Sequence, residues 1–337
     1  MLTHFTLPED KFIPAHYLPT SLIDLAAMRG VNPQKLIKGT GIFVEDICSG
    51  EVKLSALQVF KLVEKAQQLV PGYDSSFLLG QRLLADVNSP LAQALNHSRT
   101  VADYLRILWC YQDRLNPFID VSVHRSTDYI SLYLNDVMGC GHQYSYLLET
   151  YLTALSSSLK FLCAEKVKIE YQFRQSRPKH IQEYEVNLGS NIQFEQAADL
   201  IKIPRATLKC SLSGYSPLKR EYALFQLKQQ TNNKTLIQLI LKLFSRYGAI
   251  TLEETAMHLN MSPATLKRKL KQHKTRFLAL QDLYNKQQVM KIIQSMPLDY
   301  TNEDIAGLAG FSDLANFRRT FKRWFTMTPS EFKAKYT

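Results

Sequence analysis

The chain has 337 residues, of which 45% are hydrophobic, and this is enough for two domains that each bury a core. Its formal net charge is +11, and the excess lies late: residues 231–337 hold 17 Lys and Arg against 8 Asp and Glu, whereas residues 1–230 hold 24 against 22. Because no run of about 18 apolar residues and no basic-then-apolar start is present, the sequence argues against a membrane partner and predicts a cytoplasmic protein.

The first 215 residues predict an α+β domain. Apolar residues recur at helical spacing in several early segments, and Thr100 followed by Asp103 gives one of them a capped start. The expected helices cover residues 22–29, 32–38, 54–70, 76–84, 100–114 and 144–164. Apolar and polar residues alternate over 119–124, 129–134 and 167–173, with shorter candidate strands at 192–194, 201–203 and Leu208. These segments predict helices packed with a small sheet.

Aromatic and basic residues gather in the middle of this domain. Such a set would suit an apolar effector molecule that carries a carboxylate. The candidate effector-binding residues are Arg106, Trp109, Arg114, His124, Arg125 and Tyr133. Aromatic residues at helical or strand spacing are more often core residues, so an ordinary hydrophobic core is the alternative interpretation.

A mostly polar helix over 216–230 follows, opened by Ser216 and Pro217 and ended by the polar run 231–234. Polar runs of this kind favour a domain boundary. We therefore expect a first domain over 1–215, an interdomain linker helix over 216–233 and a second domain over 234–337.

The second domain contains one short pattern twice. Thr251 with Glu254, and Thr301 with Asp304, place a hydroxyl and a carboxylate where the N–H groups of a first helical turn need acceptors. A tight turn and a second capped helix follow in each copy. In these second helices, apolar residues at intervals of three and four form an inner face, and Lys and Arg occupy the outer face. The pattern predicts an all-α domain with two helix-turn-helix units that bind double-stranded DNA.

A helix over 277–295 separates the two units. At about 1.5 Å per residue it spans roughly 28 Å. That length suits the presentation of two recognition helices to successive major grooves, which recur about every 34 Å. The helix must also serve in part as an ordinary core helix.

Residues 234–336 resemble the DNA-binding domain of AraC/XylS-type transcription regulators. The stretch IAGLAGFSDLANFRRTFKRWFTMTPSEF carries the resemblance most specifically, although Phe325-Thr326 stands where the family usually has Thr-Gly. Outward positions of both recognition helices contact bases in that family. The resemblance and the basic outer faces together give the candidate DNA-binding residues Ala264, Lys267, Arg268, Lys271, Leu314, Ala315, Arg318, Arg319 and Lys322.

Two of these residues are expected to discriminate between bases more than their neighbours. Arginine can bridge guanine O6 and N7, whereas Ala264 can offer only a methyl contact. We therefore expect Arg268 and Arg319 to contribute most to sequence preference. Phosphate contacts or salt bridges within the domain are the alternative roles for both.

The first domain is similar to the N-terminal effector or dimerisation domain of one branch of the same family, often labelled arabinose-binding. The segments YLPTSLIDLAAMRGVNPQKLIKGTGI, FLLGQRLL and SPLAQALNHSRTVADYLRILWCY carry this likeness. It implies effector sensing or homodimerisation without naming a ligand. Because the family mostly activates transcription, the resemblance implies an activator with RNA polymerase as a partner. A regulator controlled by a partner protein or by abundance alone is the alternative.

Catalytic and metal-binding motifs are weak or missing. The five cysteines are scattered without a CxxC pair, as is typical of a reducing compartment. Cys140 and His142 make only a weak metal signal, and no Ser-His-Asp pattern, phosphate loop or HExxH motif is present. We therefore expect no enzyme activity, no cofactor and no metal site.

Overall fold

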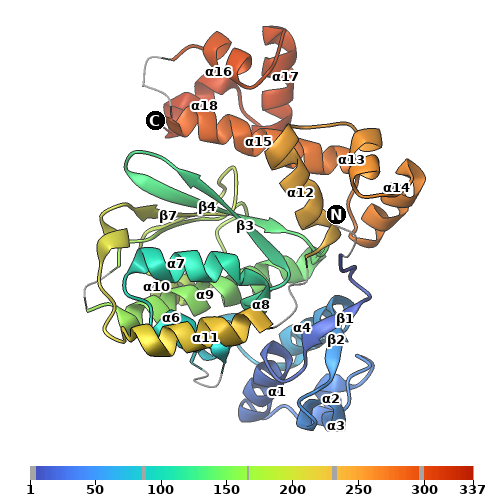
Figure 1. Cartoon of the computed structure of the whole chain (residues 1–337), viewed down its shortest axis with the longest axis vertical. Helices are drawn as coiled ribbons and strands as arrows, with labels where there is room; N and C mark the ends of the chain where they lie inside the picture. Colours follow the sequence, from blue (N-terminus) through green and yellow to red (C-terminus); the bar gives the residue numbers. More distant parts are fainter. Residues whose placement is uncertain (1–4, 86–88, 165–166, 230–233, 296–299, 337) are drawn as a thin grey trace. The chain divides into compact units, whose positions relative to one another are not determined.

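The computed structural model describes residues 5–85, 89–164, 167–229, 234–295 and 300–336 (Figure 1). These residues form two compact units, one made of most of the residues up to 236 and one made largely of residues 237–336. The first unit combines helices with a mixed sheet, and the second is built of helices throughout its described part. The predicted fold class, α+β followed by all-α, is confirmed.

The first unit begins with a small sheet next to a group of helices. The helices of this unit are α1 (Leu18–Met28), α2 (Pro33–Ile37), α3 (Val44–Cys48), α4 (Ala56–Leu69), α5 (Ser75–Leu83), α6 (Pro90–Asn96), α7 (Val101–Cys110), α8 (Gln112–Leu115), α9 (Tyr144–Leu162), α10 (Ile181–Leu188) and α11 (Pro217–Gln229). Strand β1 (Lys11–Pro14) pairs antiparallel with β2 (Lys53–Ser55). The strand β2 leads directly into α4, because Ser55 accepts the N–H of Gln58 and the Gln58 side chain accepts the N–H of Ser55.

A larger sheet has the strand order β3-β4-β7-β5-β6. Its strands are β3 (Ile119–Arg125), β4 (Tyr129–Asp136), β5 (Glu170–Gln172), β6 (Ile192–Gln193) and β7 (Leu200–Pro204). Strand β7 runs antiparallel to both β4 and β5, and β5 runs parallel to β6. Helices α7 and α9 lie along one face of this sheet (Figure 1). The sheet and the helices on it therefore position most of the six candidate effector-binding residues.

The helices of the first unit are packed closely around α9. At Gly80 of α5 an added Cβ would stand 2.5 Å from the carbonyl oxygen of Thr150 on α9, so this contact requires glycine. The ring of Tyr184 on α10 lies 5.0 Å from that of Phe77 on α5 and 5.3 Å from that of Phe173, which follows β5. The core is thus continuous from the helices to the sheet.

Helix α11 packs along α6 as part of the first unit, with Ala223 and Leu227 buried. Arg220 of α11 also forms an ion pair with Asp103 of α7. This ion pair helps to lower the pKa of the Asp103 carboxyl group, because the N–H of Arg99 and the side chains of Arg106 and Arg220 together outweigh the effect of burial. One side of α11 is thereby tied to its own unit.

The second unit is a helical domain. Its helices are α12 (Leu236–Tyr247), α13 (Leu252–His258), α14 (Pro263–Gln272), α15 (Phe277–Ser295), α16 (Asn302–Leu308), α17 (Leu314–Phe325) and α18 (Pro329–Tyr336). Helix α12 packs on α15 through Phe244, whose ring lies 5.6 Å from Phe277 and 5.7 Å from Tyr284. The predicted spacer over 277–295 has the same bounds as α15.

Several predicted elements differ in detail. The helix expected over 100–114 is interrupted at Tyr111, because the Gln112 side chain turns to accept the N–H of Val121 on β3 at 2.9 Å. Leu208 lies in a 3-10 turn (Thr207–Lys209) instead of a strand, since β7 ends at Pro204 and the chain turns there. The third strand is shorter than predicted, at Glu170–Gln172. Most of the polar run 231–234 falls on residues 230–233, which lie outside the described residues.

Candidate nucleic-acid interface and ligand cavity

The first helix-turn-helix unit is formed by α13 and α14. The Thr251 hydroxyl accepts the N–H of Glu254 at 3.2 Å, and the Glu254 carboxylate accepts the N–H of Thr251 at 2.8 Å. The N–H of Thr251 lowers the pKa of the Glu254 carboxyl group. Asn260 adopts φ 53° in the turn, and Ser262 starts α14 by accepting the N–H of Thr265 at 3.1 Å. Three short sequence signals, the capping box, Asn260 and Ser262, therefore define where the two helices begin and where the chain turns between them.

The second unit, α16 and α17, repeats this geometry with different side chains. Thr301 and Asp304 form the equivalent capping box, and the N–H of Thr301 lowers the pKa of the Asp304 carboxyl group. Gly310 has φ 79° at the position of Asn260. Asp313 starts α17 by accepting the N–H groups of Ala315 and Asn316, both at 3.0 Å.

The two recognition helices, α14 and α17, bury one face and expose the other. Leu266 and Leu270 are buried on α14, as are Phe317, Phe321 and Phe325 on α17. Eight of the nine predicted DNA-binding residues are exposed, and Leu314 is partly buried; the exposed ones are Ala264, Lys267, Arg268, Lys271, Ala315, Arg318, Arg319 and Lys322. Each helix therefore offers a basic surface to a ligand outside the domain.

Asn316 is an exposed residue of α17 that the sequence patterns did not single out. It lies in the first turn, between Ala315 and the buried Phe317. An asparagine amide can pair with adenine N6 and N7. Asn316 is not basic and so does not belong to the pattern of cations, although its place one position before an inward aromatic residue indicates an outward side chain.

Helix α15 holds the C-terminal end of α17. The Asp282 carboxylate accepts hydrogen bonds from Arg323 at 2.7 Å and from the Trp324 indole N–H at 3.0 Å. Lys286 donates to the carbonyl of Trp324 at 2.9 Å, and its Nζ lies 4.9 Å from the centre of the Phe325 ring. Arg323, although exposed, thus helps to hold α17 against α15 within the domain.

Thr326 ends α17 in the left-handed region, with φ 60°. This is the place where the sequence departs from the Thr-Gly of the resembled family. The turn forms nevertheless, and its backbone conformation is unfavourable for a β-branched residue.

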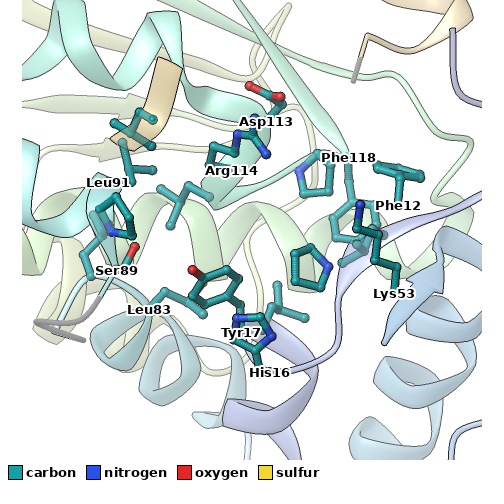
Figure 2. Close-up of a pocket in the computed structure, with 18 of the residues that line it drawn as sticks. Phe12, His16, Tyr17, Lys53, Leu83, Ser89, Leu91, Asp113, Arg114 and Phe118 are labelled. Carbon is teal, nitrogen blue, oxygen red and sulfur yellow. The ribbon is translucent and has the colours of Figure 1, made fainter. Parts of the chain in front are cut away.

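The first unit contains a cavity of about 500 Å³ (Figure 2). Its wall comes from β1 and the start of α1, the start of β2, the end of α5, the start of α6, α8 and the residues after it, and the end of α11. The lining residues are Phe12, Ile13, Pro14, His16, Tyr17, Leu18, Lys53, Leu83, Leu84, Ser89, Pro90, Leu91, Asp113, Arg114, Leu115, Pro117, Phe118, Leu227 and Gln229.

The six candidate effector residues are not brought together. Arg114 is the one of the six that lines the cavity. Trp109 donates its indole N–H to the carbonyl of Val121 at 3.1 Å, and Arg106 pairs with Asp103. Tyr133 is fully buried on β4, while His124 and Arg125 lie at the end of β3. Sequence proximity alone could not distinguish these surroundings.

The Cys140-Gly141-His142 segment is a structural turn. The Asp136 carboxylate accepts the N–H groups of Met138, Gly139 and Cys140 at 2.8–2.9 Å. Among the residues with described positions, no three His, Cys, Asp or Glu side chains are grouped in a way that could hold a metal ion. Within the same residues, no helix combines the length and the apolar character that crossing a bilayer requires.

Two family models match the chain. The arabinose-binding domain of AraC transcription regulators matches residues 30–212, more than half of the chain, and a helix-turn-helix domain matches residues 255–335. The helix-turn-helix match covers α14 and α17 together with the spacer α15.

Several known proteins are similar over nearly the full length. The ornithine utilization regulator of Pseudomonas aeruginosa is 25% identical over 332 residues, which cover 96% of each chain. An HTH-type transcriptional regulator of Mycobacterium tuberculosis is 22% identical and covers 95% of this chain and 96% of its own. Among solved structures, the transcriptional regulator CdpR from Pseudomonas aeruginosa shares 17% identity with a TM-score of 0.43, covering 94% of this chain and 97% of that one.

Proposed function

Since the chain belongs to the AraC family of DNA-binding transcription regulators, which are not enzymes, we propose that it is an activator controlled by a small molecule bound to its first domain. We assign effector binding and dimerisation to residues 1–215, the connection to residues 216–233 and DNA binding to residues 234–337. In this proposal RNA polymerase is the partner on DNA, and the protein acts in the cytoplasm.

The repeated unit carries the DNA-binding part of the proposal. Two recognition helices begin with equivalent caps and expose Lys267, Arg268 and Lys271 on α14, and Arg318, Arg319 and Lys322 on α17. Clustered cations of this kind attract phosphates and release counterions, which supplies affinity that falls with salt. The 19 residues of α15 span about 28 Å, which suits successive major grooves on one side of the duplex.

Selection of DNA from a random pool by the full-length protein, followed by footprinting, tests this part. We expect an asymmetric element for each protomer that covers two adjacent major grooves. Protection of a single groove would contradict the use of both units, and binding without sequence preference would contradict the function itself.

A cavity with both apolar and charged walls supports the sensing role of the first domain, because ligand sites are commonly concave, mostly apolar and equipped with few polar groups. One relative is named a regulator of ornithine utilization, and this name supports a metabolic signal for the present chain as well. Control by a partner protein or by abundance would replace this role if no small molecule altered DNA binding or stability.

An exposed face of α11, which packs on α6 of the first unit and lies in the segment assigned to the connection, supports homodimerisation. Leu218, Tyr222 and Phe225 of α11, which we call the α11 apolar face, are 82%, 60% and 59% exposed. They recur at intervals of four and three residues, as in helices that pair with another helix. A second copy of the chain offers the same face, so a symmetric contact would cover both.

The Phe225→Glu variant tests this dimer. We expect its dissociation constant, measured by analytical ultracentrifugation of the full-length protein, to rise at least 10-fold, because a charge would be buried in an apolar contact. Val186→Glu introduces the same side chain at an exposed apolar position on α10, away from this face in the sequence, and is the matched control. Equal dissociation constants for the two variants would exclude the α11 apolar face as the interface.

A further inference from the structure

We propose that the cavity of the first unit is the effector site and that its effector is a monocarboxylate with an apolar body, such as a medium-chain fatty acid or an arylalkanoate. This inference rests on the proposed sensing function and narrows it to one site and one chemical class.

The cavity lies where a bound molecule would contact several segments that are distant in the sequence. Its wall combines residues distant in the sequence, from Phe12 near the N-terminal end to Gln229 at the end of α11. A molecule inside would therefore touch β1, α6, α8 and α11 together. Helix α11 also carries the α11 apolar face, so a bound molecule contacts the helix through which we propose that the chain dimerises.

The wall is apolar over most of its surface. Twelve of the 19 lining residues are Phe, Ile, Leu or Pro, and among them Phe118, Leu91 and Leu115 are buried. Burial of apolar ligand surface against such a wall contributes about 25 cal/mol per Å². The volume of about 500 Å³ lies within the range of small-molecule sites, roughly 300–1,000 Å³. An alkyl or aryl chain can pack against this apolar part of the wall.

The charged groups of the wall favour an anion. Arg114 and Lys53 carry positive charges, and Asp113 carries the negative one, so the fixed charges leave an excess of one cation. The two charged residues of α8 and the pair His16 and Tyr17 lie on opposite sides of the cavity (Figure 2). A cationic amino acid such as ornithine would bring an additional ammonium group to a wall that already has this excess.

Arg114 is the best placed partner for a carboxylate. It is half-buried, whereas Lys53 and His16 are exposed, and an ion pair is weaker where water screens it. The guanidinium group can also donate two parallel hydrogen bonds to one carboxylate, which a lysine ammonium group cannot do with the same geometry.

Calorimetry and thermal melting of the full-length protein with octanoate, 4-phenylbutyrate, octanol, octylamine and ornithine test the proposal. We expect both carboxylates to bind and to raise the melting temperature, since a ligand of the folded state stabilises it. Octanol should bind at least 10-fold more weakly than octanoate, and octylamine and ornithine should leave the melting temperature unchanged.

Variants locate the site. Arg114→Gln should weaken octanoate binding at least 10-fold and leave the weak binding of octanol unchanged, with Arg114→Lys in between. Arg205→Gln removes an exposed arginine outside the cavity wall and should bind octanoate like the original chain. Leu91→Trp should abolish binding of every probe by filling the space. Thermal melting of each variant without ligand, compared with the original chain, verifies that its first unit is folded.

The outcomes separate this inference from the function on which it rests. Failure of both carboxylates to bind, or octanoate binding that Arg114→Gln does not alter, would overturn the inference while the DNA selection stands. Preference for ornithine would overturn the chemical class and leave effector sensing intact. If the original chain showed no sequence-specific DNA binding, the proposed function itself would be wrong.

Discussion

The two helix-turn-helix units share their local geometry and differ in the kinds of side chain that hold each recognition helix. Both begin with a Thr capping box and turn through a residue with positive φ. Helix α14 packs through Leu266 and Leu270, whereas α17 packs through aromatic rings whose centres lie 4.3–5.5 Å apart and is also bound to α15 by Asp282 and Lys286. Helix caps therefore define each motif locally. Contacts between residues that are distant in the sequence hold its recognition helix in place.

This difference implies that α14 and α17 contribute differently to DNA binding. A recognition helix that is held at its C-terminal end loses less conformational freedom when it enters a groove. We therefore expect α17 to contribute affinity at smaller entropic cost, and α14 to adapt more to the bases it meets. Four predictions challenge this comparison, beginning with the largest expected effect.

Replacing the central arginines should affect sequence preference in both units. Arg268→Ala and Arg319→Ala should each cost about 1–3 kcal/mol on the preferred site and relax the choice at one or two base positions. Lys322→Ala is the control, because an exposed lysine near the end of α17 should contribute equally to the affinity for every DNA sequence. Binding measured across a library of sites would show phosphate contacts instead if the arginine variants lost affinity without any change of preference.

Removing the Asp282 acceptor should destabilise the second helix-turn-helix unit, α16 and α17, and leave the first one unchanged. Asp282→Ala leaves Arg323 and the indole N–H of Trp324 without this acceptor, and we expect about 1 kcal/mol less stability, since Arg323 is 58% exposed and water screens the ion pair. Hydrogen exchange should increase in α17 and stay unchanged in α14. An equal increase in both helices would show that α15 supports the two units alike.

The sequence predicted the local parts of these units, and it could not predict the contacts of Asp282. The Thr251 and Glu254 box involves residues three positions apart, so the pattern contains all of its geometry. Asp282 and Trp324 are separated by 42 positions, and no spacing rule relates them. The cavity is a similar case, because residues from Phe12 to Gln229 form its wall and Arg114 could be distinguished from Arg106 only once α8 was placed.

Relieving the backbone strain at Thr326, in the turn after α17, should slightly raise the free energy of unfolding. Thr326 has φ 60°, where a β-branched side chain costs about 1–2 kcal/mol, and glycine removes that cost while adding chain entropy in the unfolded state. We expect Thr326→Gly to stabilise the second unit by up to about 1 kcal/mol in denaturant unfolding. Gly310→Ala is the counterpart: at φ 79° it should destabilise by a similar amount, although no neighbouring atom lies within 4 Å of the added Cβ.

The smallest effect concerns acid, and each capping box should respond to it separately. The pKa values of the Glu254 and Asp304 carboxyl groups are lowered by the N–H groups of Thr251 and Thr301, so the folded state binds protons less readily than the unfolded chain. The contribution of each box is present above the unfolded pKa, about 4.3 for Glu and 3.9 for Asp, and is lost as the pH falls through the lowered folded value. Glu254→Gln and Asp304→Asn should each remove this pH dependence from one unit and retain a polar side chain. The protection of amides in the first turns of α13 and α16, corrected for the intrinsic effect of pH on exchange, should therefore fall from pH 6 to pH 3 in the original chain. Glu254→Gln should remove this fall from α13 alone, and Asp304→Asn from α16 alone. If both turns loosened together in the variants and in the original chain, the caps would have no independent part in holding the two units.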